Sequence, residues 1–378
     1  MKNNHKRDDI GQKLKLIYSI SHNYVICDNE GSKVKKWRCM MRALFIGGTG
    51  TISAAISKLA VQNGWELYLL NRGSRGERVP EGAKIITADI NDEVSVEQLI
   101  KDMEFDVVAD FIAFIPAHIE RDIRLFSGKT KQFIFISSAS AYQKPLSCYK
   151  ITESTPLSNP YWQYSRNKID CEELLIKEYR EKELPITIVR PSHTYDERSI
   201  PLAVHGEKGS WQVIHRIING KPVIIHGDGS SLWTLTHSSD FAKAFVGIMG
   251  NSAAIGEAVH ITSDEAITWN KIYDCIGAAL NRQVKKVHVA TDFLVACMPE
   301  LKGGLTGDKS NSVVFDNSKI KRLVPNYVAT TRFDEGIRLS IQYYLSHPEL
   351  QILDEEFDKF CDKLIKVQED AVKNFNNL

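Results

Sequence analysis

The feature that most constrains the fold is a glycine-rich turn between a short apolar run and a helical segment. Residues 43–46 are apolar and predict a buried parallel strand, and the spacing of Ser53–Asn63 predicts the helix that follows. Glycines in such a turn let the backbone approach a pyrophosphate closely, while the helix N-terminus donates N–H groups to the anion. A tight turn with no ligand is the alternative. We expect a nucleotide site formed by Gly47, Gly48, Thr49, Gly50, Thr51 and Ile52.

The alternation of apolar runs and helical patterns continues to about residue 191. Further strands are expected at Glu66–Leu70, Lys84–Thr87, Phe105–Phe111, Gln132–Ile136 and Ile186–Val189. Helices are expected at Val94–Asp102, Ile119–Phe126 and Trp162–Arg180. This order predicts an α/β fold of the Rossmann type, a doubly wound parallel sheet with helices on both faces.

Residues at the ends of the second and third strands bear on the choice of dinucleotide. An acidic residue after the second strand binds the ribose hydroxyls of NAD and repels the 2′-phosphate of NADP. Here the residues are Asn71 and Arg72, so the repulsion is absent and the arginine could pair with the phosphate, stack on adenine or point to solvent. Asp89 and Ile90 are expected beside the adenine, with helix capping as the alternative for Asp89. We therefore expect NAD(P) as cofactor, with a preference for NADP.

The chain divides into three parts. Residues 1–40 carry an excess of Lys and Arg and are expected to form a loosely ordered extension. Residues 41–195 are expected to form the NAD(P)-binding Rossmann domain. Residues 196–378 are richer in irregular segments and are expected to form a smaller C-terminal α/β region that binds substrate. Because ligands of such folds bind at the carboxyl ends of the strands, the crevice should lie where the two parts meet.

Composition excludes several classes of protein. The formal net charge of +1 offers no basic field for a nucleic acid or a membrane surface. The seven cysteines form no CxxC pair, which favours reduced thiols in a cytoplasmic protein. No apolar run reaches the roughly 18 residues of a membrane span. The eleven histidines have no metal-ligand spacing, so no metal is expected.

A serine-rich strand end and a Tyr-x-x-x-Lys pair predict catalysis. The apolar run ending at Ile136 is followed by Ser137 and Ser138, and Tyr164 and Lys168 lie one helical turn apart. A neighbouring ammonium favours the phenolate and lowers the tyrosine pKa, so that the tyrosine can exchange a proton near neutral pH. A serine hydroxyl can hold the substrate oxygen.

With these three features in order, residues 42–340 resemble the short-chain dehydrogenase/reductase superfamily, and within it the extended NAD-dependent epimerase/dehydratase family. Further matching motifs are Val189-Arg190-Pro191, Gly227-Asp228-Gly229, His237-Ser238-Ser239-Asp240 and Asp316-Asn317-Ser318-Lys319-Ile320. The glycine turn also resembles that of atypical members, which include chloroplast stem-loop RNA-binding proteins.

The resemblance implies roles for individual residues. Ser138 would position the substrate, Tyr164 would be the general acid/base, and Lys168 would activate the tyrosine and bind the ribose. Ser140 and His193 would contact the substrate. Trp233 could line the crevice, with core packing as its alternative. The resemblance also implies a homodimer formed through the helix at Trp162–Arg180.

Two departures from the family pattern limit the reaction and the substrate. Dehydratases carry an Asp-Glu pair where this chain has Ala139 and Ser140, which argues against water elimination. Relatives that bind UDP-sugars place an arginine where this chain has Trp233, which weakens the nucleotide-sugar assignment. We expect an NAD(P)-dependent epimerase or dehydrogenase/reductase acting on a secondary alcohol of a small-molecule substrate, a sugar or sugar nucleotide. The alternative is a nucleotide-binding atypical member that binds RNA.

Overall fold

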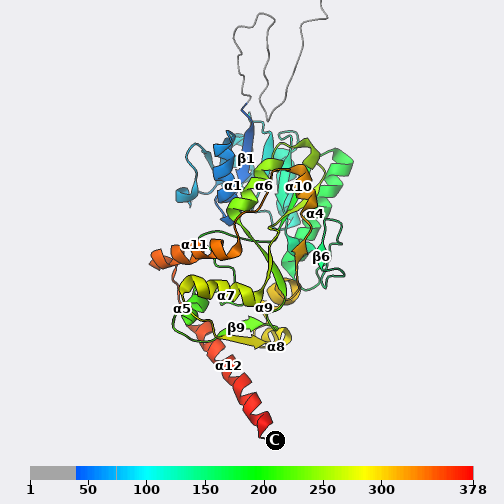
Figure 1. The fold of residues 1–378 in the computed structure, drawn as a ribbon. Coiled ribbons are helices and arrows are strands. Elements are labelled where there is room, and N and C mark those ends of the chain that lie inside the picture. The colour runs from blue at the N-terminus through cyan, green and yellow to red at the C-terminus, as the bar shows by residue number, and fades with distance from the viewer. Residues whose placement is uncertain (1–39, 74, 378) are drawn as a thin grey trace, which may run out of the picture.

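The computed structural model describes residues 40–73 and 75–377. The basic extension predicted at residues 1–40 therefore lies, except for Met40, outside the described residues. Figure 1 shows two regions that follow one another along the long axis of the molecule. The first contains the sheet around β1, and the second contains the helices α5, α7 and α12.

A parallel sheet of seven strands forms the first of these regions. Its strand order is β11-β7-β5-β4-β1-β2-β3, and every neighbouring pair is parallel. The strands are β1 (Arg42–Ile46), β2 (Glu66–Asn71), β3 (Lys84–Thr87), β4 (Val107–Asp110), β5 (Phe133–Ile136), β7 (Ile186–Pro191) and β11 (Ala258–Ile261). The chain runs outward in both directions from β1 and β4, and open α/β sheets bind ligands in the crevice at such a reversal.

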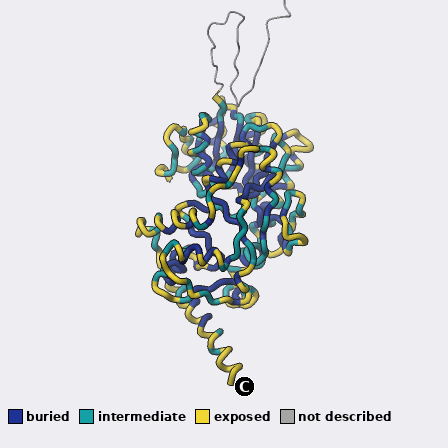
Figure 2. The backbone as a smooth tube through the Cα atoms, viewed as in Figure 1, coloured by how far each residue is buried: buried dark blue, intermediate teal, exposed yellow. Residues whose placement is uncertain are grey.

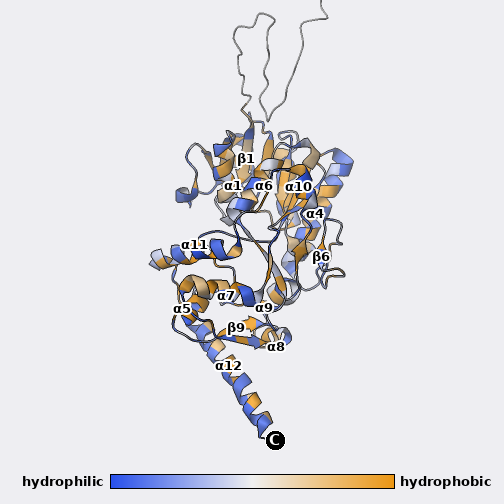
Figure 3. Ribbon diagram, in the orientation of Figure 1, coloured by the Kyte–Doolittle hydropathy of each residue, from blue (hydrophilic) through white to orange (hydrophobic). Residues whose placement is uncertain are grey.

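Helices cover both faces of this sheet, as predicted. The helices are α1 (Thr51–Gln62), α2 (Glu93–Leu99), α3 (Pro116–Phe126), α4 (Gln163–Lys182), α6 (Ser238–Ile248) and α10 (Ser318–Leu323). Apolar side chains of α1, α6 and α10 pack on one face, and those of α2, α3 and α4 pack on the other. Most strands of the sheet are buried in Figure 2 and hydrophobic in Figure 3, whereas the edge strand β3 is largely exposed and the outer faces of the helices are hydrophilic. This burial, at ~25 cal/mol per Å² of apolar surface, is the main force holding the layers together.

The second region is built from short strands and helices. One small sheet has the order β12-β10-β8, and two strand pairs are β13-β9 and β14-β6. The strands are β6 (Lys150–Ile151), β8 (His193–Tyr195), β9 (Val223–His226), β10 (Leu232–His237), β12 (Ala266–Thr268), β13 (Lys286–Val289) and β14 (Val314–Phe315). The helices are α5 (Trp211–Ile218), α7 (Trp269–Leu280), α8 (Thr291–Cys297), α9 (Leu301–Gly304), the π-helix η4 (Leu305–Lys309), α11 (Phe333–Ser346) and α12 (Glu355–Asn376). Their apolar side chains form a core of their own.

The predicted fold class is confirmed, with one strand added. The sequence predicts six strands, but Ala258–Ile261 pairs with β7 and extends the sheet at its edge. Helix α6 also covers the sheet, so residues beyond 195 contribute to the first region as well as to the second. The division of the chain at residue 195 stays a prediction.

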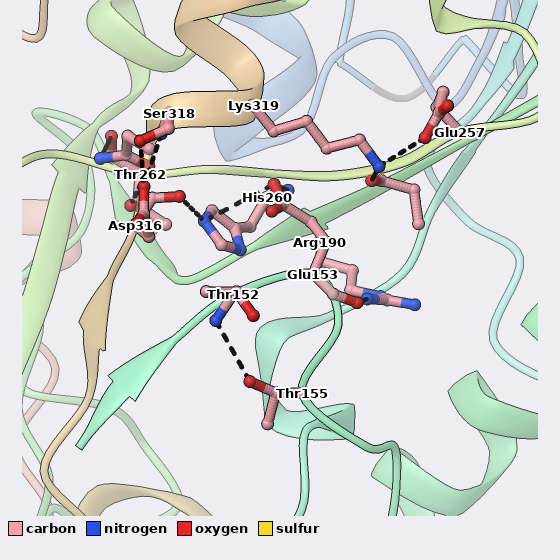
Figure 4. Close-up of polar contacts among 12 residues, drawn as sticks. Thr152, Glu153, Thr155, Arg190, Glu257, His260, Thr262, Asp316, Ser318 and Lys319 are labelled. Carbon is pink, nitrogen blue, oxygen red and sulfur yellow. Dashed lines mark hydrogen bonds and ion pairs between the residues drawn. The ribbon is translucent and has the colours of Figure 1, made fainter. Parts of the chain in front are cut away.

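Polar contacts around β11 tie the two regions together (Figure 4). The ring of His260, which is fully buried, bonds to the Tyr142 hydroxyl at 3.0 Å and to the Asp316 carbonyl at 2.8 Å. Lys319 donates to the Ala258 carbonyl at 2.7 Å, and Lys150 pairs with Asp316 at 2.8 Å. The motif at residues 316–320 therefore fastens the second region to the edge of the sheet.

None of the described helices has both the length and the apolar character needed to cross a lipid bilayer. Within residues 40–73 and 75–377, no three His, Cys, Asp or Glu side chains are grouped so that they could hold a metal ion.

Candidate active site

The glycine turn joins β1 to α1 at the carboxyl edge of the sheet. Gly47 has φ +81°, and a Cβ atom there would lie 2.5 Å from Cγ2 of Ile112. The hydroxyl of Ser53 donates to the Gly47 carbonyl at 2.7 Å and accepts from the N–H of Gly50 at 2.8 Å. Ser53 thus closes the turn from the position where a third glycine is usual. The turn needs glycine at residue 47 both for its backbone conformation and for space.

A cavity of about 440 Å³ opens beside this turn and the ends of β2 and β3. Seven of the predicted cofactor residues line it: Gly47, Thr49, Gly50, Asn71, Arg72, Asp89 and Ile90. The other four predicted residues are not in its lining: Gly48, Thr51 and Ile52 form the turn and the first turn of α1, and Lys168 lies on α4. Arg75, Phe114 and His118 also line it, and the sequence did not single them out.

This cavity has the polar groups that a dinucleotide needs. The side-chain N–H₂ of Asn71 is buried without a partner among the described residues, while its oxygen accepts from Gly73 N–H at 2.9 Å. Helix α1, whose first residue is Thr51, points its N-terminus toward the cavity side of the turn and has no acidic residue in its first turn. A helix N-terminus without acidic side chains favours a bound anion. The residues present therefore fit a dinucleotide.

The loop after β4 forms another part of this cavity. The carboxylate of Asp110 is fully buried and accepts from the N–H groups of Ile112 at 2.5 Å and Ala113 at 2.9 Å. Arg121 bonds to the same carboxylate at 3.0 Å. A buried charge needs such partners to be tolerated. Asp110 thus shapes the loop that carries Phe114 into the site.

A chain of hydroxyl groups follows β5. The Oγ atoms of Ser138 and Ser140 are 2.8 Å apart, and Ser165 of α4 donates to Ser140 at 2.8 Å. Burial raises the pKa of Tyr164, and a hydrogen bond with Ser138 partly opposes the rise. The structure therefore brings Ser138, Ser140 and Tyr164 together.

Lys168 follows Tyr164 by one turn of α4, and its ammonium is turned toward the sheet. It donates to the carbonyls of Ala113 at 2.6 Å and Ile136 at 2.7 Å, and lies 5.8 Å from the centre of the Tyr164 ring. Burial lowers the pKa of Lys168 to about 8. The sequence predicts that Lys168 lowers the tyrosine pKa, but in the structure burial dominates at Tyr164 and raises it. Burial of the phenol is the largest cause of this rise.

A second cavity, of about 280 Å³, lies on the other side of Tyr164. The predicted substrate residues Ser140, His193 and Trp233 line it, together with Ser138 and Tyr164. Burial lowers the pKa of His193 to about 3, which keeps its ring neutral near pH 7. Lys168 lines neither cavity.

The two cavities approach each other at Phe114 and Tyr164. Phe114 lines the first cavity and its ring centre lies 6.5 Å from that of Tyr164, which lines the second. The ammonium of Lys168 lies 4.8 Å from the Phe114 ring. A nucleotide in the first cavity and an alcohol in the second would therefore lie on either side of an acid/base group.

Sequence reasoning missed several residues of the second cavity. Trp162 stands two residues before Tyr164, with ring centres 5.0 Å apart, and Asp308 and Lys309 come from the π-helix η4. The sequence could have predicted that Trp162 lies at this site, because it directly precedes the helix that carries the Tyr-x-x-x-Lys pair. Asp308 and Lys309 belong to no motif, and only the tertiary packing of η4 brings them to the site.

Comparisons with known proteins agree with this geometry. The model of the family described as "NAD dependent epimerase/dehydratase family" matches residues 43–262. The 2'-dehydrokanamycin reductase of Streptomyces kanamyceticus is 23% identical over 287 residues, which cover 76% of this chain and 80% of that protein. The chloroplast stem-loop binding protein of 41 kDa b of Arabidopsis thaliana is 25% identical over 242 residues, which cover 61% of this chain and 60% of that protein.

The fold is also that of solved structures. The dTDP-glucose 4,6-dehydratase of Bacillus anthracis, solved in complex with NAD, superposes with a TM-score of 0.65. The match covers 82% of this chain and 98% of that chain, at 18% sequence identity. An identity this low establishes the shared fold and leaves the reaction to the site itself.

Proposed function

Because the chain belongs to the NAD-dependent epimerase/dehydratase family, we propose that it transfers a hydride between NAD and a secondary-alcohol carbon of a sugar or sugar nucleotide. The observation that carries this proposal is the position of Tyr164, between a cavity built for a dinucleotide and a second cavity lined by hydroxyl groups. Such a position is what a general acid/base requires.

The proposed roles follow from the contacts. When bound, NAD supplies the site that accepts or gives up the hydride. In oxidation, the phenolate of Tyr164 takes the proton of the substrate hydroxyl while the hydride leaves the same carbon, and the product is a ketone. Ser138, which is hydrogen-bonded to Tyr164, holds the substrate oxygen. The charge of Lys168, 5.8 Å from the centre of the Tyr164 ring, offsets part of the burial that disfavours the phenolate. Reduction runs the same steps in reverse.

The site favours hydride transfer over water elimination. Elimination in this family needs an acid and a base beside the catalytic hydroxyl, and this chain has Ala139 and Ser140 there. The relatives include a protein named as a reductase, and the family description includes epimerases. We propose that the ketone is either released, as in a dehydrogenase or reductase, or reduced on its other face, as in an epimerase.

We propose NAD as the cofactor. The preference for NADP that Asn71 and Arg72 suggested finds no support in the comparisons, because the matching family is NAD-dependent and the compared dehydratase holds NAD. Asn71 can still donate to a ribose hydroxyl through its unpartnered N–H₂ group. Arg72 is exposed at the rim of the cavity, so water solvates its charge and no phosphate group is needed to balance it.

RNA binding is not proposed. One relative is named as a stem-loop binding protein. Phosphate contacts by Lys and Arg dominate RNA and DNA affinity, however, and this chain has a formal net charge of +1. The cytoplasmic location and the homodimer formed through α4 stay predictions.

The variant Tyr164→Phe tests the proposed role directly. It keeps the ring but removes the proton-carrying oxygen, so turnover of NAD should fall by about 10² to 10⁴ while NAD affinity stays within about twofold. Turnover is followed by NADH absorbance with a panel of sugars and sugar nucleotides. Tyr179→Phe, on the exposed side of the same helix, is the matched control. Equal turnover by the two variants would refute the mechanism.

A further inference from the structure

Three polar groups in the wall of the substrate cavity have no polar partner. The indole N–H of Trp233 has no acceptor, although the residue is only 2% exposed. Among the described residues, no hydrogen bond or ion pair reaches the carboxylate of Asp308. The ammonium of Lys309 lies 5.8 Å from the Trp162 ring and 6.0 Å from the Trp233 ring. Asp308 and Lys309 are half-buried, and the Trp233 N–H is buried. A buried polar group left without a partner is costly, and at a cavity wall it indicates a ligand that supplies one.

Hydrogen bonds fix the segment that carries Asp308 and Lys309. The Lys309 carbonyl accepts from the indole N–H of Trp269 at 3.1 Å, and His226 bonds to it at 3.1 Å. The Asn159 amide donates to the carbonyls of Gly307 at 2.7 Å and Ser140 at 2.8 Å. The segment is therefore held in register with the serine chain. Its π-helical form is of the kind that occurs often at functional sites.

The chemistry of this wall matches a sugar ring. Tryptophan faces pack against the apolar face of a ring, and hydroxyl groups can both donate to a carboxylate and accept from an indole N–H. Burial raises the pKa of Asp308, and the ammonium groups of Lys309 and Lys144 oppose the rise. A carboxylate in this setting gains most from donor groups of the ligand, hydroxyl or ammonium.

The same wall is a poor match for a nucleoside diphosphate. Trp233 occupies the position at which the resemblance to UDP-sugar enzymes places an arginine. No arginine lines the cavity as described, and a diphosphate would bring two negative charges toward Asp308. At about 280 Å³ the cavity is also at the small end of the ~300–1,000 Å³ that is usual for drug-sized ligands.

We infer that Asp308 and Trp233 form a subsite that holds the reacting sugar ring directly, without a nucleoside diphosphate as handle. Asp308 accepts hydrogen bonds from hydroxyl or ammonium groups of the ring, and the Trp233 N–H donates to a ring oxygen. This inference rests on the proposed function and selects a free glycoside over a sugar nucleotide as its substrate. It makes Asp308 and Trp233 specificity-determining residues.

Ligand titrations on the full chain loaded with NAD test the subsite. The probes are methyl glucoside, glucosamine and UDP-glucose, and quenching of tryptophan fluorescence reports binding. We expect both free sugars to bind and Asp308→Asn to weaken them by about tenfold or more, as for a lost hydrogen bond to a charged group. The loss should be larger for glucosamine, whose ammonium pairs with the carboxylate. Trp233→Phe, which keeps an aromatic ring, should weaken both by about fivefold.

Matched controls separate the possible failures. Asp102→Asn changes an exposed aspartate far from the cavity lining and should leave all three affinities unchanged. The proposed subsite is overturned if Asp308→Asn and Asp102→Asn bind the free sugars with equal affinity, or if neither free sugar binds. It is also overturned if UDP-glucose binds more tightly than both free sugars and its affinity is unchanged in Asp308→Asn. NAD affinity is measured separately on each variant, so that a failure of the subsite can be distinguished from a failure of the proposed function. If the proposed function is wrong, the wild-type chain does not bind NAD at all.

Discussion

Lys168 shows how a single buried charge sets the pH range of the site. Its ammonium is held by two carbonyls, and burial lowers its pKa to about 8. In the proposed mechanism the charged side chain favours the phenolate of Tyr164, and as the pH rises through about 8 this charge is lost. Because oxidation also needs the phenolate of Tyr164, whose pKa is raised by burial, the wild-type kcat/KM for oxidation should rise with pH up to about 8 and level off above it.

Lys168→Met should remove that levelling of kcat/KM near pH 8, because only the tyrosine then titrates. Without the ammonium the tyrosine pKa is higher, so the rising limb of the profile moves to higher pH. At pH 7 we expect kcat/KM to fall by about 10²-fold. The measurement is the pH profile of kcat/KM, with Lys177→Met, an exposed lysine on the same helix, as control. If the pH profile of kcat/KM for Lys168→Met has the same shape as that of the wild type, the lysine does not act on the tyrosine.

The sequence predicts the positions of site residues that belong to a motif better than the positions of residues that reach the site only through tertiary packing. Ser138, Tyr164 and the glycines are placed by short local patterns, because a strand end and one helical turn fix their relative positions. Asp308 and Lys309 reach the same cavity from η4, a segment whose packing depends on contacts far along the chain. Local spacing carries no signal for such contacts, and this limits what sequence analysis can say about substrate.

Helix α4 is the element that carries the proposed catalytic groups. Tyr164, Lys168 and Glu172 follow one another at intervals of four residues and share a face. Glu172 is fully buried and accepts from Arg190 of β7 at 2.9 Å and from Ser137, the residue before Ser138. This buried ion pair therefore holds α4 in register with the ends of β5 and β7.

Breaking this pair should cost both stability and catalysis. Glu172→Gln leaves the Arg190 guanidinium without a counter-charge, which costs about 3 kcal/mol or more of unfolding free energy. We expect a lower urea midpoint together with a lower kcat and an unchanged NAD affinity. Glu173→Gln, its exposed neighbour, is the control. If the two variants unfold at the same urea concentration, the ion pair does not hold the helix.

The edge strand β11 is the strand of the large sheet that the sequence did not predict. The run Ala258–Ile261 is only four residues long and lies among irregular segments, and a short apolar run does not distinguish a buried strand from other buried structure. Its place in the sheet is decided by pairing with β7, seventy residues earlier in the chain. By contrast, the long helix predicted at Trp162–Arg180 is found at Gln163–Lys182, because its period repeats over five turns.

At the scale of the whole molecule, function follows from where the two regions meet. The sheet presents its carboxyl edge, with the glycine turn, Ser138 and the loop after β4, and the second region adds the wall that carries Trp233 and Asp308. The contact of His260 with the Asp316 carbonyl, next to β14, fixes the two regions to each other. The proposed substrate and cofactor cavities therefore approach each other at Phe114 and Tyr164.

The central claim is that the first cavity binds NAD through the glycine turn, and titration calorimetry tests it most directly. NAD is titrated into the wild-type chain, Gly47→Ala and Gly128→Ala. Both glycines have positive φ, but an added Cβ at Gly47 meets Ile112 at the cavity while one at Gly128 meets nothing within 4 Å. The account predicts equal NAD affinity for wild type and Gly128→Ala, and a loss of at least about tenfold, ~1.4 kcal/mol, for Gly47→Ala. No NAD binding by the wild-type chain, or equal affinity in all three, would contradict it.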